Sequence, residues 1–255
     1  MNNIFNLSRF NRLFVKHTVE NYKSYLMSLT VLMGVMILGG SFLIYMIEAP
    51  MDRGLQTALF SIILLLAGTI FTSTIFSGYG DKKKAVALLT LPASHFEKYL
   101  VAWIYSFLLF IILYTAGFFL VVSFAINVKH FPGHQDGVIN FFKTPVCQMY
   151  ILYALMHAVA FYGAIFYDKL HFIKTAFLFF ISVGLLIAIN KILLSVFIPK
   201  TIETTVPFGN LRIQSDQQTF EINVSQQDYW MIAIISVLAV VFWIAAYFRL
   251  KEKQV

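Results

Sequence analysis

Six long apolar runs separated by shorter polar segments dominate the pattern of hydrophobic and polar positions in this chain. Each run reaches the length of about 20 residues that a helix needs to cross a bilayer. The runs cover residues 24–47, 55–77, 99–126, 146–167, 172–198 and 229–248. The pattern therefore predicts an all-α membrane protein with six transmembrane helices.

Ahead of the first run, residues 1–23 predict an amphipathic interfacial helix that lies in the headgroup layer. The charged face would hold Arg9, Arg12, Lys16, Glu20 and Lys23, and the apolar face Leu7, Phe10, Leu13 and Phe14. The segment lacks a long apolar stretch with a small-residue cleavage site, so it is not a signal peptide. It is either a connecting helix that contacts a cytoplasmic partner or a surface anchor without one.

Between the second and third runs, a basic cluster precedes a short amphipathic helix and a sharp corner. The cluster and the apolar face of the helix consist of Lys82, Lys83, Lys84, Ala85, Leu88, Leu89 and Leu91. Pro92 ends this helix because the residue before a proline is pushed out of the α region. Ser94 and Glu97 then form an S-x-x-E capping box that begins the next helix. We expect residues 82–91 to form a surface helix that passes a push from a soluble partner into the membrane.

The segments on the other side of the membrane differ from each other. Residues 127–145 contain Pro132, Gly133 and Gly137, which predict irregular or re-entrant structure. Within residues 199–228, apolar and polar positions alternate on both sides of a turn near Asp216, which predicts a small extracytoplasmic β-hairpin before the last helix. The chain would then have four parts, namely the connecting helix at 1–23, helices one to five at 24–198, the β-rich loop at 199–228, and the last helix with a cytoplasmic tail at 229–255.

Basic residues predict the orientation of these helices. With both termini in the cytoplasm, 13 of the 19 basic residues fall on that side, which agrees with the positive-inside rule. The 13 are Arg9, Arg12, Lys16, Lys23, Lys82, Lys83, Lys84, Lys98, Lys169, Lys174, Arg249, Lys251 and Lys253. We expect a multi-pass protein of the cytoplasmic membrane.

Composition agrees with this class and excludes others. The chain is 59% hydrophobic and 12% charged, whereas a soluble domain is typically about 45–50% apolar. The sequence pI of about 9.4 reflects basic loops and does not indicate nucleic-acid binding. The single cysteine, Cys147, excludes an intramolecular disulfide and a multi-cysteine metal site.

Catalytic motifs are missing from the sequence. It contains no G-x-x-x-x-G-K-[ST], H-E-x-x-H, G-x-S-x-G or G-x-G-x-x-G motif, so we expect neither an enzyme nor a nucleotide site in this chain. Asp and Glu are also missing from the middle of all six runs. Proton-coupled carriers and intramembrane proteases usually need such buried ionisable groups, so both classes are disfavoured.

A few polar residues allow a functional and a structural interpretation. His130, His134 and Asp136 could hold a metal ion, but Pro132 and Gly133 break helical spacing between the histidines, so a solvated loop is favoured and no metal site is predicted. The fourth run contains His157, which either contacts substrate or is satisfied by a neighbouring Tyr or backbone carbonyl. Near the outer end of the fifth run, Asn190 and Lys191 either face a polar passage or place the lysine at the headgroups.

Small and hydroxyl residues form smooth rows on the first two runs. The rows contain Thr30 and Gly34 on the first run, and Thr69, Ser73 and Ser77 beside Gly68 and Thr72 on the second. Such rows let two membrane helices approach closely. They serve either helix packing within one subunit or a dimer seam or translocation path.

The corner after the second run carries a family resemblance. Residues 87–100 read ALLTLPASHFEKYL, which is similar to the leucine-rich, proline-serine segment that ABC-type-2 transporter permeases carry between their second and third spans. The six-span plan, the amphipathic N-terminal helix and the large outer segment before the last span also resemble that family. The likeness covers essentially the whole chain.

The resemblance implies the permease subunit of a bacterial ABC exporter in the inner membrane. It would pair with a second permease, identical or different, and with cytoplasmic ABC ATPase subunits that bind ATP and Mg and move a coupling helix when they dimerise. Residues 82–91 would be that coupling helix, and residues 7–22 the connecting helix. From the residues themselves, we predict that Leu88 and Leu89 anchor hydrophobically while residues 82–84 and Lys98 set the orientation through acidic partner residues or lipid phosphates. No cofactor is expected in this chain itself. The apolar spans favour a lipid-like or amphipathic substrate.

Two other functions stay open on the sequence. A non-transporting scaffold or sensor would bind a partner through its outer β element, and changes at Leu88 and Leu89 would leave it unaffected. A secondary carrier would depend on an ion gradient instead of ATP. Family members often have short re-entrant helices where residues 199–228 here look β-rich, which leaves the substrate open.

Overall fold

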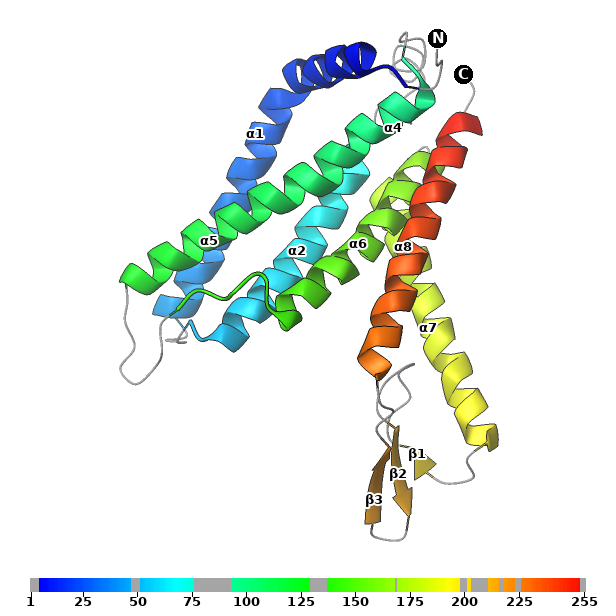
Figure 1. Cartoon of the computed structure of the whole chain (residues 1–255). Coiled ribbons are helices and arrows are strands. Elements are labelled where there is room, and N and C mark those ends of the chain that lie inside the picture. The colour runs from blue at the N-terminus through cyan, green and yellow to red at the C-terminus, as the bar shows by residue number, and fades with distance from the viewer. Residues whose placement is uncertain are drawn as a thin grey trace.

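Six long helices make up most of the part of the chain that this computed structural model describes (Figure 1). The structure describes residues 5–46, 51–75, 93–128, 137–167, 169–197, 201–202, 211–215, 218–222 and 226–252. Five helices run as single elements, namely α1 (Leu7–Tyr45), α2 (Arg53–Ile75), α6 (Thr144–Phe166), α7 (His171–Phe197) and α8 (Gln227–Glu252). The sixth is composite, with α4 (His95–Trp103), the π-helical η2 (Ile104–Leu109) and α5 (Phe110–Val128) in continuous order.

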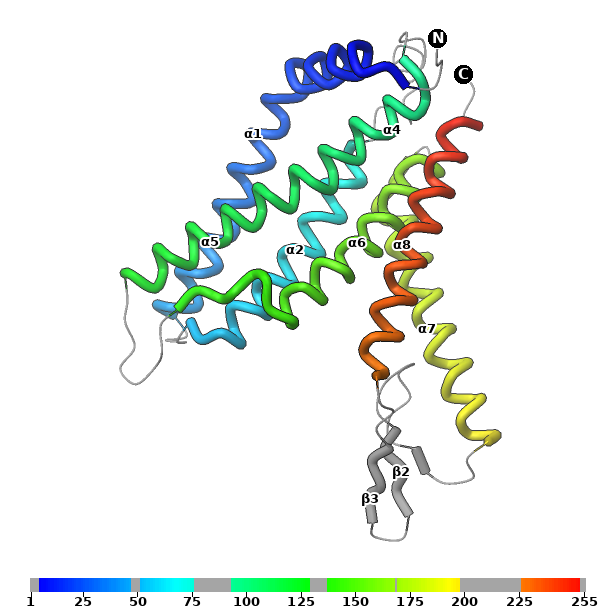
Figure 2. The backbone as a smooth tube through the Cα atoms, in the orientation of Figure 1, coloured from blue at the N-terminus to red at the C-terminus, as the bar shows by residue number. Residues whose placement is uncertain are grey.

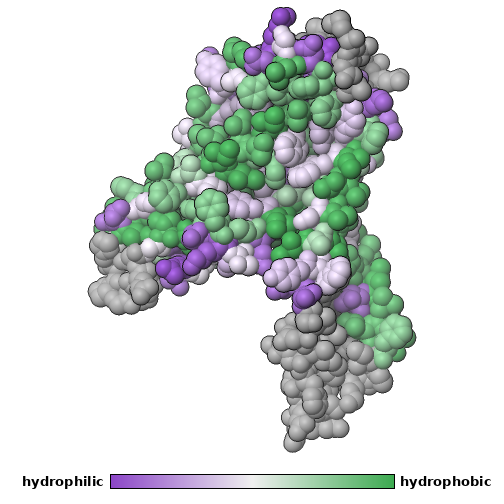
Figure 3. All heavy atoms as spheres, in the orientation of Figure 1, coloured by the Kyte–Doolittle hydropathy of each residue, from purple (hydrophilic) through white to green (hydrophobic). Residues whose placement is uncertain are grey.

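All six helices are long and apolar enough to cross a membrane. They coincide with the six predicted runs to within a few residues, except that α1 begins far earlier. Apolar residues cover much of the surface between more hydrophilic ends (Figure 3). These features fit a multi-pass membrane protein, and each of the six predicted runs forms a helix long and apolar enough to span a membrane.

Helix α1 combines two predicted elements. We expected a separate helix over residues 1–23, but α1 continues from Leu7 to Tyr45 without interruption. Figures 1 and 2 show its first turns lying across one end of the bundle before the helix turns along the other helices. No proline or glycine lies between Leu7 and Thr30, so nothing in the sequence forces the helix to stop. Its N-cap is Asn6, whose side chain accepts hydrogen bonds from the N–H groups of Ser8 and Arg9.

The third span begins where the sequence predicts. Ser94 is the N-cap of α4, and its side chain accepts a hydrogen bond from the N–H of Glu97 (3.1 Å). The Glu97 side chain in turn accepts one from the N–H of Ser94 (2.9 Å). This confirms the predicted capping box.

An aromatic core joins α2, α5 and α6. Phe60, Tyr114 and Tyr153 are fully buried, and the Tyr114 hydroxyl donates to the carbonyl of Phe60 (2.7 Å). Gly68 lies against the ring of Tyr153, where a Cβ atom would collide with that ring. The small row on α2 thus lets α6 approach closely.

A second cluster joins α6 to α8 and to the start of α4. It includes Tyr99, Phe161 and Leu250, with Ala164 and Ala246 as small residues at the contact. Helix α7 is different, because none of its residues is buried. The bundle therefore has a packed part and one helix, α7, that contacts α6 but buries none of its residues fully.

The expected fold class needs a correction at the β-hairpin. Wherever the structure describes side chains, the chain is all-helical and contains no strand, so no β-hairpin belongs to the packed fold. Between α7 and α8 the structure describes only backbone pairing, in the antiparallel order β1 (Thr201–Ile202), β2 (Leu211–Ser215) and β3 (Gln218–Ile222). A hairpin of two such strands is at best marginally stable by itself in water. The alternation of polar and apolar residues over 199–228 therefore led to a wrong prediction of an independent β element.

Candidate functional site

Glu97, at the start of α4, is the centre of a hydrogen-bonded junction with the first turn of α1. Its side chain is fully buried. One carboxylate oxygen accepts from the N–H of Asn6 (2.8 Å) and from Arg9 Nη2 (2.8 Å). The other accepts from Arg9 Nε (3.0 Å) and from the N–H of Ser94 (2.9 Å). A single carboxylate thus links the beginnings of two helices that are far apart in the sequence.

The donors around Glu97 make its burial tolerable. A buried carboxylate is costly unless it is paired and its oxygens accept hydrogen bonds, and here a bidentate guanidinium and two backbone N–H groups supply both. Glu97 precedes the apolar part of its span, residues 99–126. The hydrogen bonds from Arg9, Ser94 and Asn6 all favour the charged form of the carboxyl. The site therefore holds an ionised carboxylate at neutral pH.

Aromatic rings extend the junction on both sides of α4. The ring of Phe96 lies edge-on to Phe5 (centroids 6.2 Å apart), and to Tyr247 of α8 (6.0 Å). One turn later, the Tyr99 hydroxyl donates to the carbonyl of Trp243 in α8 (2.9 Å). The start of α4 is thus attached to both α1 and α8, the helices nearest the two chain termini (Figure 1).

A strip of contacts continues along α1 toward the membrane. Thr18 bonds the hydroxyl of Tyr105, and the ring of Phe14 packs on Tyr105 (5.0 Å). Tyr25 stacks on Tyr105 (5.3 Å) and bonds Nε2 of His17 (2.6 Å). The start of α1 therefore packs on the beginning of the third span over several turns.

The predicted faces of the N-terminal helix are partly changed. Arg12, Lys16, Glu20 and Lys23 are exposed as expected. Arg9 was placed with them, but it is half-buried because Glu97 draws it inward. Leu7 was placed on the apolar face and is 72% exposed.

Most of the predicted coupling interface falls outside the described residues. This applies to Lys82, Lys83, Lys84, Leu88, Leu89, Leu91 and Pro92, and to Ser77 of the small-residue row. The rest of that interface, Ser94 and Glu97, lies in the junction described above. Lys98, next to it, is buried as well.

The two small-residue rows have different surroundings. On α2, Thr69 and Ser73 are buried, and their hydroxyls donate to backbone carbonyls of α2 itself. On α1, Thr30 is exposed, and Gly34 has open space where a Cβ would lie. The row on α2 thus packs within this chain, whereas the row on α1 is not covered by it.

His157 has its ring nitrogens satisfied in the bundle interior. Trp243 Nε1 donates to Nδ1 (3.1 Å), so in the neutral ring Nε2 carries the proton and donates to Ser106 Oγ (2.8 Å). Ser106 lies in the π-helical η2 and donates to the carbonyl of Ala102 (2.8 Å). This is the satisfied histidine of the structural interpretation, although its partners are Ser106 and Trp243.

The remaining polar candidates add no site. His130, His134 and Asp136 lie outside the described residues, and the described part of the chain holds no group of three metal-binding side chains. Near the end of α7, Asn190 is half-buried and Lys191 exposed.

Sequence reasoning identified Ser94 and Glu97 as a local cap but missed the pairing of Glu97 with Arg9. The only signal was the acidic residue itself, placed among basic residues just before an apolar run. No spacing rule connects two residues 88 positions apart. Comparisons of this chain with protein-family models, curated proteins and solved structures find no match.

Proposed function

We propose that this chain is the membrane-spanning permease subunit of an ATP-binding-cassette exporter. A separate cytoplasmic ATPase would bind ATP and Mg and hydrolyse the nucleotide, and a second permease, identical or different, would complete the pathway. Residues 82–91 would be the coupling helix that the ATPase moves. The proposal draws on the resemblance of residues 87–100 to ABC-type-2 permeases and on the junction centred on Glu97.

The Glu97 junction is the observation that carries the proposal. Only two residues separate Pro92, the predicted end of the coupling helix, from the first residue of α4, His95. From there, ionic and hydrogen bonds connect Glu97 to α1, and aromatic contacts connect Phe96 and Tyr99 to α8. A displacement applied just before α4 would therefore reach three membrane helices through directional contacts, which suits a subunit that receives mechanical work.

We further propose that both termini face the cytoplasm of a bacterial cell, with the junction at the inner surface of its cytoplasmic membrane. Both chain ends lie at the junction end of the bundle (Figure 1), and the basic residues favour that side as cytoplasmic. The single cysteine permits a direct test. In a Cys147→Ser background, Lys83→Cys should react with a membrane-impermeant maleimide only after permeabilisation, whereas Phe142→Cys, at the other end of the bundle, should react in intact cells. The reverse pattern would contradict this orientation.

The coupling role is tested by the double substitution Leu88→Asp, Leu89→Asp. Two carboxylates in place of the hydrophobic anchors should prevent docking of the ATPase, since charge is disfavoured in the core of an interface. We expect the variant to insert into the membrane normally, to lose the co-purifying ATPase and to lose transport-linked ATP hydrolysis. Leu170→Asp is the matched control, because Leu170 is 62% exposed in the connection between α6 and α7 at the same end.

Two results would contradict the proposal. One is that no nucleotide-hydrolysing protein co-purifies with the wild-type chain from mild detergent. The other is that the ATPase co-purifies equally well with the double variant. Transport that continues after ATP depletion but stops when the ion gradient collapses would instead indicate a secondary carrier.

A further inference from the structure

A deep apolar cavity lies between α1 and α2, away from the Glu97 junction. Its volume is about 530 Å³, within the range of about 300–1,000 Å³ typical of small-molecule sites. Helix α1 packs against α5, where Met33 contacts Gly117. The space between α1 and α2 is left open. Phe110 and Tyr114, both buried, contribute to its lining from the side of α5.

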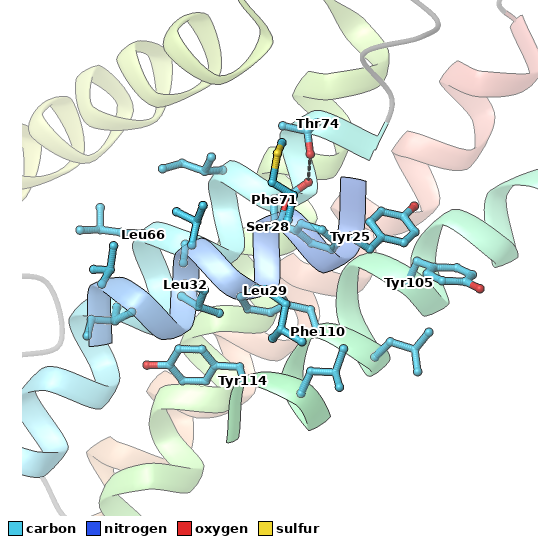
Figure 4. A pocket seen from close by; sticks show the side chains of 18 residues that line it. Tyr25, Ser28, Leu29, Leu32, Leu66, Phe71, Thr74, Tyr105, Phe110 and Tyr114 are labelled. Atoms are coloured by element: carbon cyan, nitrogen blue, oxygen red, sulfur yellow. Dashed lines mark hydrogen bonds between the residues drawn. The ribbon is translucent and has the colours of Figure 1, made fainter. Parts of the chain in front are cut away.

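The two ends of the cavity differ in chemistry. Tyr25, Ser28 and Thr74 bring hydroxyl groups to one end (Figure 4). Leu66 lies at the other end, where the Tyr114 hydroxyl already donates to the carbonyl of Phe60. The described residues that line the cavity include no charged side chain. The Tyr25 hydroxyl bonds His17, but a phenol can both donate and accept, so it keeps capacity for a second partner. The cavity is thus amphipathic along its length.

We propose that this cavity binds the hydrocarbon chain of a long-chain amphiphile, with its polar oxygen atoms at Tyr25. Several wall residues, including Val35 and Leu66, are more than half exposed, so the cavity opens on the surface that lipid would cover. There the surrounding medium is hydrocarbon, and a flexible acyl chain enters an apolar cavity without dehydrating a polar group.

The volume argues against a transmembrane helix as the occupant. A helix about 10 Å wide fills the volume of this cavity in about 7 Å of its length, which is less than two turns. A single acyl chain with an oxygen-bearing end matches both the size and the polarity of the space.

Binding of an acyl chain in the cavity is tested by photocrosslinking of the full-length protein in lipid nanodiscs. The probe is palmitic acid with a diazirine at the far end of its chain. We expect adducts on both walls of the cavity, on α1 and on α2, and competition by unlabelled palmitate. Uniform labelling of every exposed apolar helix face, with no competition, would overturn the proposal.

Substitutions that fill the cavity test whether the acyl chain binds there. Leu66→Trp should fill the cavity from α2 and weaken competable labelling by about tenfold or more. Ile62→Trp is its control, since Ile62 is equally exposed (57% each), on the same helix, and does not line the cavity. If Leu66→Trp does not fold, Val35→Trp should fill the cavity from α1 instead. Ile37→Trp, on the same helix and outside the cavity, is its control. Unchanged labelling in a folded blocking variant would contradict the site.

The polar end is tested by Tyr25→Phe, with Tyr22→Phe, exposed on the same helix, as its control. Losing one hydrogen bond should weaken palmitate competition by about three- to tenfold, and a diazirine alkane without a carboxyl group should bind equally to both variants. Equal palmitate affinity in both variants would refute the role of Tyr25. These measurements need no ATPase, so they can fail or succeed independently of the coupling test. The further step, that the amphiphile is the transported substrate, rests on the proposed function.

Discussion

Two buried polar side chains hold the opposite ends of this molecule, and they differ in charge. At one end the ionised Glu97 binds Arg9 and the backbone of two helix starts. At the other end the neutral amide of Gln56, also fully buried, donates to the carbonyls of Met51 and Gly137 (2.7 and 3.0 Å) and accepts from the N–H of Ile139 (2.9 Å). Both solve the same problem, which is to attach a distant segment of backbone to the start of a membrane helix.

The difference concerns how each junction can be altered. An amide has no charge to lose, so the Gln56 junction is fixed at any pH at which the protein folds. The Glu97 junction depends on an ion pair with a guanidinium that is 37% exposed at its side chain, so it responds to pH and to the charge of a partner. The junction that responds to pH and charge lies at the end where we propose that the ATPase docks, and the junction that does not respond lies at the other end. This arrangement suits a subunit that transmits motion from the ATPase.

The largest effect is expected from Gln56→Leu. Leucine keeps the apolar volume but leaves backbone groups of Met51, Gly137 and Ile139 without partners, at about 1–3 kcal/mol for each buried group that stays unsatisfied. The melting temperature of the purified protein in detergent should fall by several degrees or more. The half-buried Gln148 provides the control, Gln148→Leu, on α6 near the same end. A melting temperature as high as that of the control would mean that water replaces the amide.

A smaller loss is expected from Glu97→Gln. The amide preserves the shape of the side chain but removes the charge that balances Arg9, and its nitrogen turns one acceptor into a donor facing N–H groups. Arg9 is partly exposed, so water can recover some of its hydration. The melting temperature should fall less than for Gln56→Leu, and ATPase coupling should weaken. Glu20→Gln should be neutral, since Glu20 forms an exposed pair with Lys16.

These two junctions also show what the sequence could predict and what it could not. The six spans and the capping box of Ser94 and Glu97 follow from patterns within a few residues of each other, so the sequence predicts them. The hydrogen bonds of Gln56 to Gly137 and of Arg9 to Glu97 join residues 81 and 88 positions apart. Hydropathy treats each of these residues only as a polar position near a span end, and it cannot say which two will meet.

The same limit applies to helix packing. The second and fifth runs look alike in the sequence, yet α2 buries Phe60, Leu64 and Gly68 while α7 buries nothing. Lipid tails are as apolar as leucine, so hydrophobicity does not distinguish a protein-facing helix from a lipid-facing one. The row of small residues on α2 was a useful signal because α6 packs closely against it, whereas the similar row on α1 is not covered within this chain.

Acid should weaken one end of the molecule and not the other. The donors around Glu97 bind its charged form, so its stabilising contribution is present above the unfolded pKa of about 4.3. It is lost when acid protonates the carboxylate of the folded protein. Below about pH 4.3 the wild type should lose stability toward that of Glu97→Gln, and Gln56→Leu should show the same pH dependence as the wild type. Equal acid sensitivity of wild type and Glu97→Gln would show that other carboxyl groups dominate.

The smallest effect is expected from Arg9→Lys, which separates charge from geometry at the Glu97 junction. Lysine keeps the positive charge but has one ammonium group in place of the planar fork, so it cannot reproduce the paired bonds from Nε and Nη2. The melting temperature should fall less than for Glu97→Gln, and the exposed Arg12→Lys should leave it unchanged. If Arg9→Lys were as damaging as Glu97→Gln, the bidentate geometry and not the neutralised charge would be the essential property. The junction would then act as a rigid joint, and a change of pH that leaves the geometry intact would not affect coupling.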